Sequence, residues 1–215
     1  MTLLLHIKIP GALILASDCR VTGRKKDRYG KINYVVTDSE QKTFPIGRNM
    51  AVSYCGNADP NGLPASFLLG KAVSSIHPST VQEAAASMQE WFSDSHIPRP
   101  SLLFSGYSAQ EPMVLSLPSD ADQFKDQYPD RNVYGITTMG DNRIAEALIH
   151  SGPVDFHQLR ISDAVSFSEL LIKTTAGLQR IESGIQTVSE ACDILVMTAS
   201  DLRWVRHDSE MFGQL

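Results

Sequence analysis

Segments with strand-like and helix-like patterns follow one another in blocks along this chain, and the order of the blocks restricts the fold more than any other feature of the sequence. Strands come first, two helices follow, then strands, two more helices and two final strands. The strands are predicted at residues 2–9, 12–18, two within 42–56, 101–108, 112–118, 132–138, 192–200 and 203–208, and the helices at 64–76, 79–94, 141–151 and 166–185. This grouping favours an α+β fold with helices packed outside strand layers over regular β-α-β alternation.

Turn and capping signals mark the ends of several of these elements. Pro10 and Gly11 separate two short runs rich in Leu and Ile, which is typical of a hairpin. Ser79 or Thr80 is expected to cap the second helix, because Glu83 lies where a capping box places its acidic partner. The local signals therefore agree with the order of the blocks.

Length and charge limit the kind of protein that this chain can be. Its 215 residues suit one well-buried domain covering 1–215. A formal net charge of −5 argues against a general nucleic-acid-binding face. One stretch, RVTGRKKDRYGK, is locally basic, and residues 20–32 are expected to form a polar connection.

The cysteines and the first apolar segment bear on the compartment. Cys19, Cys55 and Cys192 are far apart and lack the spacing of metal ligands, so we expect a reduced, cytoplasmic protein without a bound metal. His6 and Lys8 interrupt the first apolar segment, which is too short to span a membrane and has no signal-peptide cleavage pattern. We expect no membrane or nucleic-acid partner and no cofactor.

The Met-Thr start indicates a role for the beginning of the chain. Initiator Met is normally removed before a small residue, and its removal leaves Thr2 with a free α-amine beside its own hydroxyl. An α-amine titrates near pH ~8, so part of it can act as a base at neutral pH. A Thr hydroxyl with an N-terminal amine is a known activated nucleophile. The alternative is that Thr2 merely begins the protein.

Three further positions carry the groups that such a nucleophile needs. The second strand ends in Ala-Ser-Asp-Cys-Arg, which supplies Asp18 and Arg20. Lys42 stands at the start of a later strand, where its charge would lower the proton affinity of a nearby hydroxyl. Gly56 ends the next strand, where a backbone N–H could approach a developing oxyanion. The alternatives are a structural ion pair, a solvated strand end and a turn.

Taken in order, these residues resemble the pattern of proteasome-type β subunits and of the bacterial HslV peptidase, which are N-terminal-nucleophile hydrolases. The matching motifs are Thr2, ASDCR, QKTFPI and GNAD. The resemblance implies a four-layer αββα sandwich over nearly the whole chain. It also implies that Thr2 is both nucleophile and base, that Asp18 is the buried carboxylate orienting Lys42, and that Gly56 belongs to the oxyanion hole.

The second half of the chain matches this family less closely. A Gly-Ser-Gly-like turn of the family falls on TTMGDN, which makes Thr138 or Gly140 the supporting residue. An Asp-x-x-Ser-Gly pattern of the family falls near Ser183, but no Asp precedes it by three residues. Thr187 and Ser189 are competing placements. These groups support the active threonine, so their loss implies altered tuning or a folded, inactive subunit.

Residues 22–40 are longer than the HslV equivalent is expected to be, and they lie between Asp18 and Lys42. Two interpretations stay open for this insertion. It either shapes the substrate cleft or contacts a neighbouring subunit, or it is a solvated loop.

The resemblance implies a threonine endopeptidase that works as a subunit of a self-compartmentalising bacterial particle. It implies a homo-oligomer, a ring or an open spiral, with peptide or unfolded protein as substrate and an ATPase or other regulator as a further partner. Two alternatives remain: a catalytically inactive structural subunit of such a barrel, and an amidase of the same superfamily that acts on a small molecule.

Overall fold

The first sheet of the structure brings the two ends of the sequence together. The computed structural model describes residues 2–27, 30–182 and 185–209. Five antiparallel strands lie in the order β10-β1-β2-β11-β12. Their bounds are Gly135–Gly140 for β10, Leu3–Ile9 for β1, Ala12–Asp18 for β2, Cys192–Met197 for β11 and Leu202–His207 for β12. The hairpin predicted around Pro10 is therefore confirmed.

The second sheet is formed by the middle of the chain. It is also antiparallel, in the order β5-β6-β7-β8-β9. Its strands are β5 (Thr43–Ile46), β6 (Met50–Cys55), β7 (Ser101–Ser108), β8 (Glu111–Leu117) and β9 (Lys125–Asp126). The sequence predicts the first four. At two residues, β9 is too short for an alternating pattern to indicate it.

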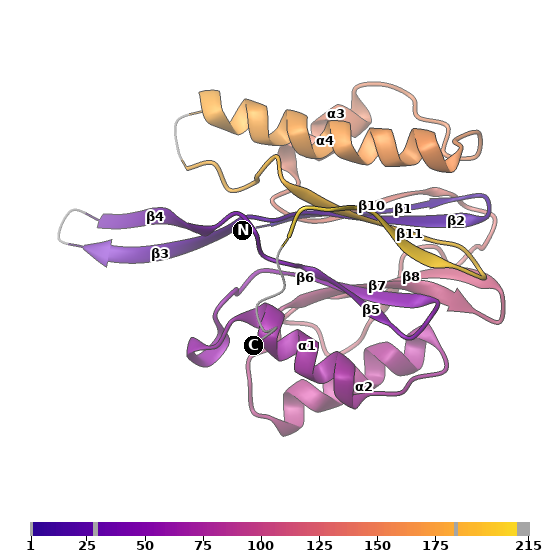
Figure 1. Ribbon diagram of the computed structural model, residues 1–215, viewed down its shortest axis with the longest axis horizontal. Helices are drawn as coiled ribbons and strands as arrows, with labels where there is room; N and C mark the ends of the chain where they lie inside the picture. Colours follow the sequence, from indigo (N-terminus) through magenta and orange to yellow (C-terminus); the bar gives the residue numbers. More distant parts are fainter. Residues whose placement is uncertain (1, 28–29, 183–184, 210–215) are drawn as a thin grey trace.

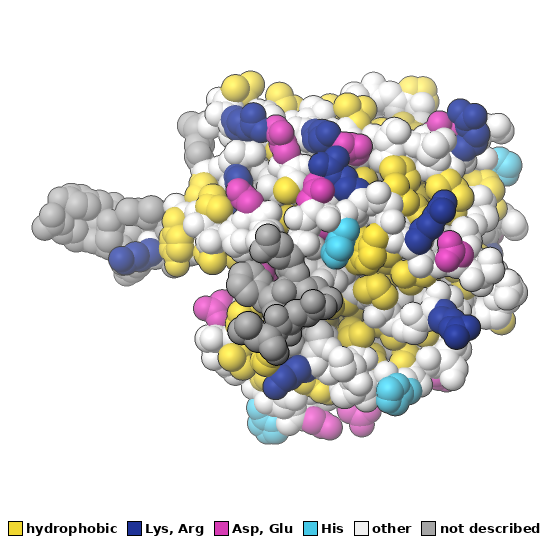
Figure 2. Space-filling model, in the orientation of Figure 1, with side chains coloured by type: hydrophobic (Ala, Val, Ile, Leu, Met, Phe, Trp, Pro, Cys, Tyr) yellow, Lys and Arg dark blue, Asp and Glu magenta, His cyan; other side chains and the backbone are white. Residues whose placement is uncertain are grey.

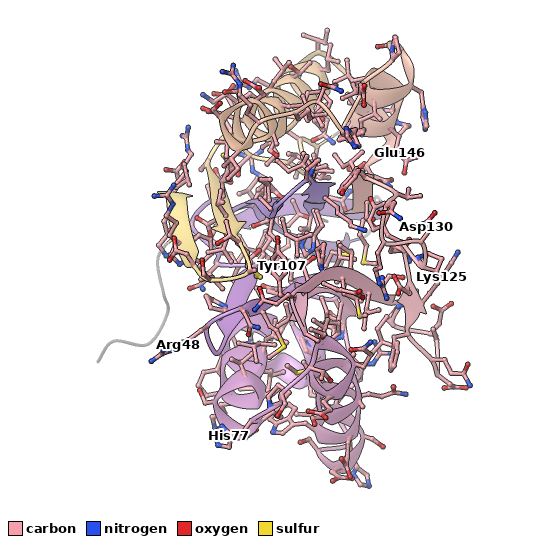
Figure 3. The ribbon with its side chains drawn as sticks, turned by 90° about the vertical axis from the view of Figure 1, so that its right-hand side faces the viewer. Arg48, His77, Tyr107, Lys125, Asp130 and Glu146 are labelled. Carbon is pink, nitrogen blue, oxygen red and sulfur yellow. The ribbon has the colours of Figure 1, made fainter. Side chains whose placement is uncertain are left out.

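Helices cover the outer faces of both sheets. A short 3-10 turn, Pro60–Gly62, precedes α1 (Ala65–Ser75) and α2 (Val81–Asp94), while α3 (Arg143–His150) and α4 (Ile161–Ile181) follow β10. Figure 1 shows α1 and α2 against the second sheet and α3 and α4 against the first. Figure 3, turned by 90°, shows the same order of helices, sheet, sheet and helices. The predicted arrangement of helices outside strand layers is thus observed.

Capping groups explain where two of the helices begin. Thr80 caps α2, since its Oγ1 accepts the N–H of Glu83 at 3.1 Å, and the Glu83 carboxylate accepts the N–H of Ser79 at 2.8 Å. Helix α4 begins at Ile161, earlier than the predicted start at 166. The Asp163 carboxylate accepts the N–H of Arg160 at 3.1 Å and stabilises that earlier first turn.

Three apolar layers result, and β1 lies between two of them. Leu3, Leu5 and Ile7 pack under α3 and α4, whereas Leu4 faces the second sheet. A third layer fills the space between the second sheet and the helices α1 and α2. Because β1 is buried on both faces, its sequence is nearly continuously apolar and does not alternate.

The prediction of a polar connection at residues 20–32 is wrong, because a β-hairpin begins at Val21. Strand β3 (Val21–Asp27) pairs with β4 (Gly30–Thr37), and within the described residues neither strand pairs with any other. This arm extends beyond the body of the molecule at the end where β1 begins (Figure 1). The Tyr34 ring packs over Gly23, where an added Cβ would lie 2.5 Å from it, so an aromatic side chain covers the glycine across the strands. At the arm residues whose burial the structure describes, 21–23, 25 and 33–37, the side chains are partly or fully exposed, so polar and charged residues are compatible with strands here.

Among the side chains between the two sheets, His6 has no exposed surface. Its Nδ1 lies 2.7 Å from Ser105 Oγ and its Nε2 lies 2.8 Å from Ser53 Oγ. Burial lowers the pKa of the imidazole to about 3, so the ring is neutral at pH 7. One ring nitrogen therefore donates a hydrogen bond and the other accepts one.

We expect His6 to make the fold acid-sensitive. The unfolded chain binds a proton at this histidine near pH ~6.5, whereas the folded chain does not until about pH 3. The free energy of unfolding therefore falls as pH drops below the unfolded pKa. Between pH 7 and 5 the loss from this one group is about 2 kcal/mol. Urea unfolding of wild type and His6→Gln at both pH values measures it, and an equal pH dependence in the two proteins would contradict the assignment.

Candidate functional site

A buried ion pair joins the two sheets at the end of the molecule where β1 begins. Asp18 is the last residue of β2 in the first sheet, and Lys42 precedes β5 in the second. Lys42 Nζ lies 2.9 Å from Asp18 Oδ1, and both side chains are fully buried. The ammonium also donates to the backbone oxygen of Arg20 at 2.6 Å. Removal of two charges from water is costly, and these direct contacts compensate for it.

Asp18 also accepts hydrogen bonds from three backbone N–H groups. The donors are Leu3 at 2.9 Å, Arg20 at 3.0 Å and Ser189 at 3.2 Å. Because Leu3 follows Thr2 directly, the carboxylate holds the chain at the start of β1. One carboxylate thus links Lys42, the start of the chain and the segment before β11.

Thr2 is held on its other side by the end of β10. Its side chain and backbone are only 5% exposed, and its carbonyl oxygen accepts the N–H of Asp141 at 2.6 Å. Gly140 has a φ of +94°, and a Cβ added there would lie 1.9 Å from the Thr2 carbonyl oxygen. Only glycine suits both the left-handed backbone and this close approach. Gly140, one of the supporting residues considered from the sequence, therefore lies directly against Thr2.

Gly56 follows the last residue of β6 on the other side of this site. Its φ of +102° is strained for any residue with a side chain. Its neighbour Cys55 has its Cβ 3.5 Å from the position that a Gly140 Cβ would occupy. The strand end that carries Gly56 therefore reaches the site around Thr2.

A polar cluster of Asp141, Gln179 and Thr187 lies next to Thr2. The Thr187 hydroxyl donates to the Asp141 carboxylate, and the Gln179 amide donates to the same oxygen at 3.1 Å. The Gln179 carbonyl accepts the N–H groups of Thr187 and Val188, each at 2.9 Å. Thr187 is one of the placements predicted from the sequence, whereas Asp141 and Gln179 are not among the predicted residues. The sequence signal that could have identified Asp141 was an acidic residue directly after Gly140.

Of the remaining sequence candidates, Thr138 contacts α3, Ser183 lies outside the described residues and Ser189 contacts Asp18. The Thr138 hydroxyl lies 2.8 Å from Glu146 on α3 and accepts from Asn142 at 2.8 Å. Figure 3 shows Glu146 among the side chains around α3. Ser183 lies outside the described residues. Ser189 accepts the N–H of Cys19 through its hydroxyl at 3.1 Å and donates its own N–H to Asp18.

The cysteines near the site are poor nucleophiles. Burial raises the pKa of the Cys55 thiol to about 11, although the Lys42 charge opposes the shift. Burial also raises the pKa of Cys19, and it raises that of Cys192 to about 12. A neutral thiol reacts slowly, so these groups do not compete with a hydroxyl nucleophile at pH 7.

The described residues contain neither a group of side chains that could bind a metal ion nor a helix that could cross a membrane. Within residues 2–27, 30–182 and 185–209, no three His, Cys, Asp or Glu side chains are grouped so that they could hold a metal ion. In the same part of the chain, no helix is long and apolar enough to cross a membrane.

Comparison with solved structures identifies the fold. Among 261 similar chains is the Gly-1 mutant of Anbu from Hyphomicrobium sp. strain MC1, with a TM-score of 0.65 and 14% sequence identity. The match covers 98% of this chain and 89% of the Anbu chain. Anbu is a bacterial proteasome-like N-terminal-nucleophile hydrolase, and the likeness shows a shared fold without singling out HslV. No family model and no curated protein matches the sequence.

Proposed function

We propose that this chain is an N-terminal threonine peptidase subunit whose nucleophile is Thr2 after removal of Met1. The observation that carries the proposal is the buried Asp18–Lys42 pair, whose carboxylate holds the backbone directly after Thr2. The fold shared with Anbu supports a proteasome-like function. We also propose that the stacked helices and sheets are the four-layer αββα sandwich of that superfamily.

The proposed reaction is acyl transfer through an ester on Thr2. The Thr2 hydroxyl attacks the peptide carbonyl carbon, and its proton passes to the α-amine of the same residue. The C–N bond then breaks, and the leaving amine takes that proton. Water hydrolyses the resulting ester and restores the free hydroxyl. Peptide would bind as an extended strand.

The neighbouring groups have separate roles in this scheme. Lys42 supplies positive charge that favours the ionised hydroxyl, and Asp18 orients Lys42 through the 2.9 Å contact. Gly56 supplies an N–H to the oxyanion of the tetrahedral intermediate. The backbone N–H of Asp141 holds the Thr2 carbonyl, and the Asp141 carboxylate is hydrogen-bonded to Thr187 and Gln179. We propose that this cluster supports Thr2 in the way that the family resemblance implies for Thr138 and Ser183.

Activity on amides tests the proposal. Purified protein is first examined by intact-mass spectrometry, and we expect the mass of a chain that lacks Met1. Fluorogenic peptides and small amides are then assayed in parallel. Hydrolysis of the peptides supports a peptidase. Hydrolysis of small amides alone identifies the amidase, and a Met1-free chain inactive on both is a structural subunit.

We propose that the chain forms a homo-oligomer, a ring or a spiral, and that the arm formed by β3 and β4 takes part in it. Tyr34, Val35 and Val36 are consecutive and each more than 40% exposed, so both faces of β4 carry uncovered apolar groups. Figure 2 shows hydrophobic side chains where the arm joins the body. An isolated two-stranded hairpin is only marginally stable in water, and a contact with another subunit would stabilise it.

Removal of apolar surface from the arm should weaken assembly. Val35→Thr combined with Val36→Thr keeps the β-branched shape but makes the surface polar, so we expect light scattering at micromolar concentration to show a smaller species than wild type. Val133→Thr is the control, since Val133 is similarly exposed (47%) but lies away from the arm. A wild-type protein that is monomeric near 23.6 kDa would exclude the assembly itself, and an unchanged size in the double variant would exclude the arm.

A further inference from the structure

Between the sheets, a series of hydrogen-bonding side chains connects β1, which follows Thr2, to β5, which follows Lys42. His6 of β1 contacts Ser53 of β6 at 2.8 Å, and the Ser53 hydroxyl lies 2.8 Å from that of Thr43. Thr43 is the first residue of β5 and follows Lys42 directly. All of these side chains are fully buried.

The surroundings of this chain of contacts are apolar. Leu4, Leu13 and Leu103 belong to the layer between the sheets. Apolar packing is not directional, so this layer alone tolerates small shifts of one sheet over the other. Hydrogen bonds have preferred lengths and angles, and an unpaired buried polar group is costly, so they fix a position that apolar contacts leave adjustable.

The backbone of Lys42 belongs to the second sheet, but its side chain acts on the first. The N–H of Tyr54 donates to the Lys42 carbonyl at 3.0 Å, and Thr43 pairs with Ser53 in the ladder of β5 and β6. The Lys42 ammonium crosses to Asp18 and to the backbone of Arg20. The place of the ammonium relative to Thr2 therefore depends on how the two sheets are aligned.

We propose that His6, Ser53 and Thr43 are positioning residues that align the second sheet with β1 and so set the place of Lys42 relative to Thr2. This inference rests on the proposed function of that site. None of the three is a catalytic residue, because each acts through Lys42. The neutral imidazole suits this role, since it can donate to one serine and accept from the other.

Two serines on either side of the same imidazole allow a matched comparison. Ser53 and Ser105 are both fully buried, and both contact His6, at 2.8 and 2.7 Å. The Ser53 hydroxyl contacts that of Thr43, which follows Lys42 in the sequence. Ser105 lies on β7, which is separated from β5 by β6. Ser105→Ala removes the contact to His6, and Thr43→Val removes the contact to Ser53, so these two variants should lose similar stability. Ser53→Ala removes a contact to His6 and a contact to Thr43 and should lose more.

The experiment compares Ser53→Ala, Ser105→Ala and the isosteric Thr43→Val in peptide hydrolysis and thermal unfolding. We expect Ser53→Ala and Thr43→Val to lower kcat by about tenfold or more with little change in KM, because a small misplacement of a catalytic group is costly. Ser105→Ala should keep kcat within about twofold of wild type, although its unfolding midpoint should fall about as far as that of Thr43→Val. Equal kcat losses in the two serine variants, or none, would overturn the proposal.

A second readout does not depend on activity. The ¹³Cε resonance of Lys42, assigned through Lys42→Arg, reports the surroundings of the ammonium directly. We expect it to move in Ser53→Ala and Thr43→Val and to stay in place in Ser105→Ala. If wild type hydrolyses no amide, the proposed function fails, and the resonances still decide the positioning role. An unmoved Lys42 resonance in all three variants overturns it.

Discussion

Replacement of Thr2 by Ala is expected to abolish amide hydrolysis while the fold and the assembly persist. The variant keeps the α-amine but loses the hydroxyl that attacks the substrate, so no acyl-enzyme can form. The contacts that hold this part of the chain are made by backbone atoms: the Thr2 carbonyl accepts from Asp141, and the N–H of Leu3 donates to Asp18. These contacts do not need the Thr2 side chain. Peptide assays, light scattering and thermal unfolding measure the three outcomes.

Thr2→Ser is the matched control for this variant. Ser, Ala and Thr are all small enough for removal of Met1, so the three proteins start with a free amine at the same position. Serine retains the hydroxyl, and we expect measurable hydrolysis from it and none above background from Thr2→Ala. Comparable rates in Thr2→Ala and wild type would show that another group is the nucleophile and would remove Thr2 from the proposed mechanism.

Local sequence patterns predict the elements that form the site, because these elements are buried and their turns are specific. The strands on either side of Pro10 and Gly11, the second of which ends at Asp18, are recognised because they are short apolar runs separated by a turn signal. The arm was not recognised. Where their burial is described, its strands are partly or fully exposed, so the alternation that indicates a strand packed on a core is not expected, and its charges are typical of a loop.

The cluster beside Thr2 shows a different limit of sequence reasoning. Asp141, Gln179 and Thr187 meet because β10 pairs with β1 and α4 ends over the same sheet edge. Those pairings join segments far apart in the chain, and a local pattern does not contain them. The family pattern has an aspartate near the end of its last helix. In this chain, we propose that the carboxylate of Asp141, which directly follows β10, takes that role.

Lys42→Met is expected to abolish hydrolysis by a different route from Thr2→Ala. The hydroxyl and the α-amine remain, but the positive charge that favours the ionised hydroxyl is lost. Lys42→Arg should not restore activity, because the guanidinium is wider than the ammonium and the Lys42 site is fully buried. Steady-state peptide hydrolysis measures both variants. A Lys42→Arg protein as active as wild type would reduce Lys42 to a structural charge.

Loss of stability must be separated from loss of chemistry in this experiment, because Lys42→Met leaves the buried Asp18 carboxylate without its ion-pair partner. Such a change typically costs about 3–5 kcal/mol. The double variant Asp18→Asn with Lys42→Met removes both charges, and the single oxygen of an amide at position 18 can still accept the backbone N–H groups of Arg20 and Ser189, which share Oδ2 of Asp18. We expect urea unfolding to show the double variant as more stable than Lys42→Met. It should nevertheless be as inactive, since its site holds no ammonium. Recovery of hydrolysis together with stability would mean that the ion pair maintains the fold and takes no part in the reaction.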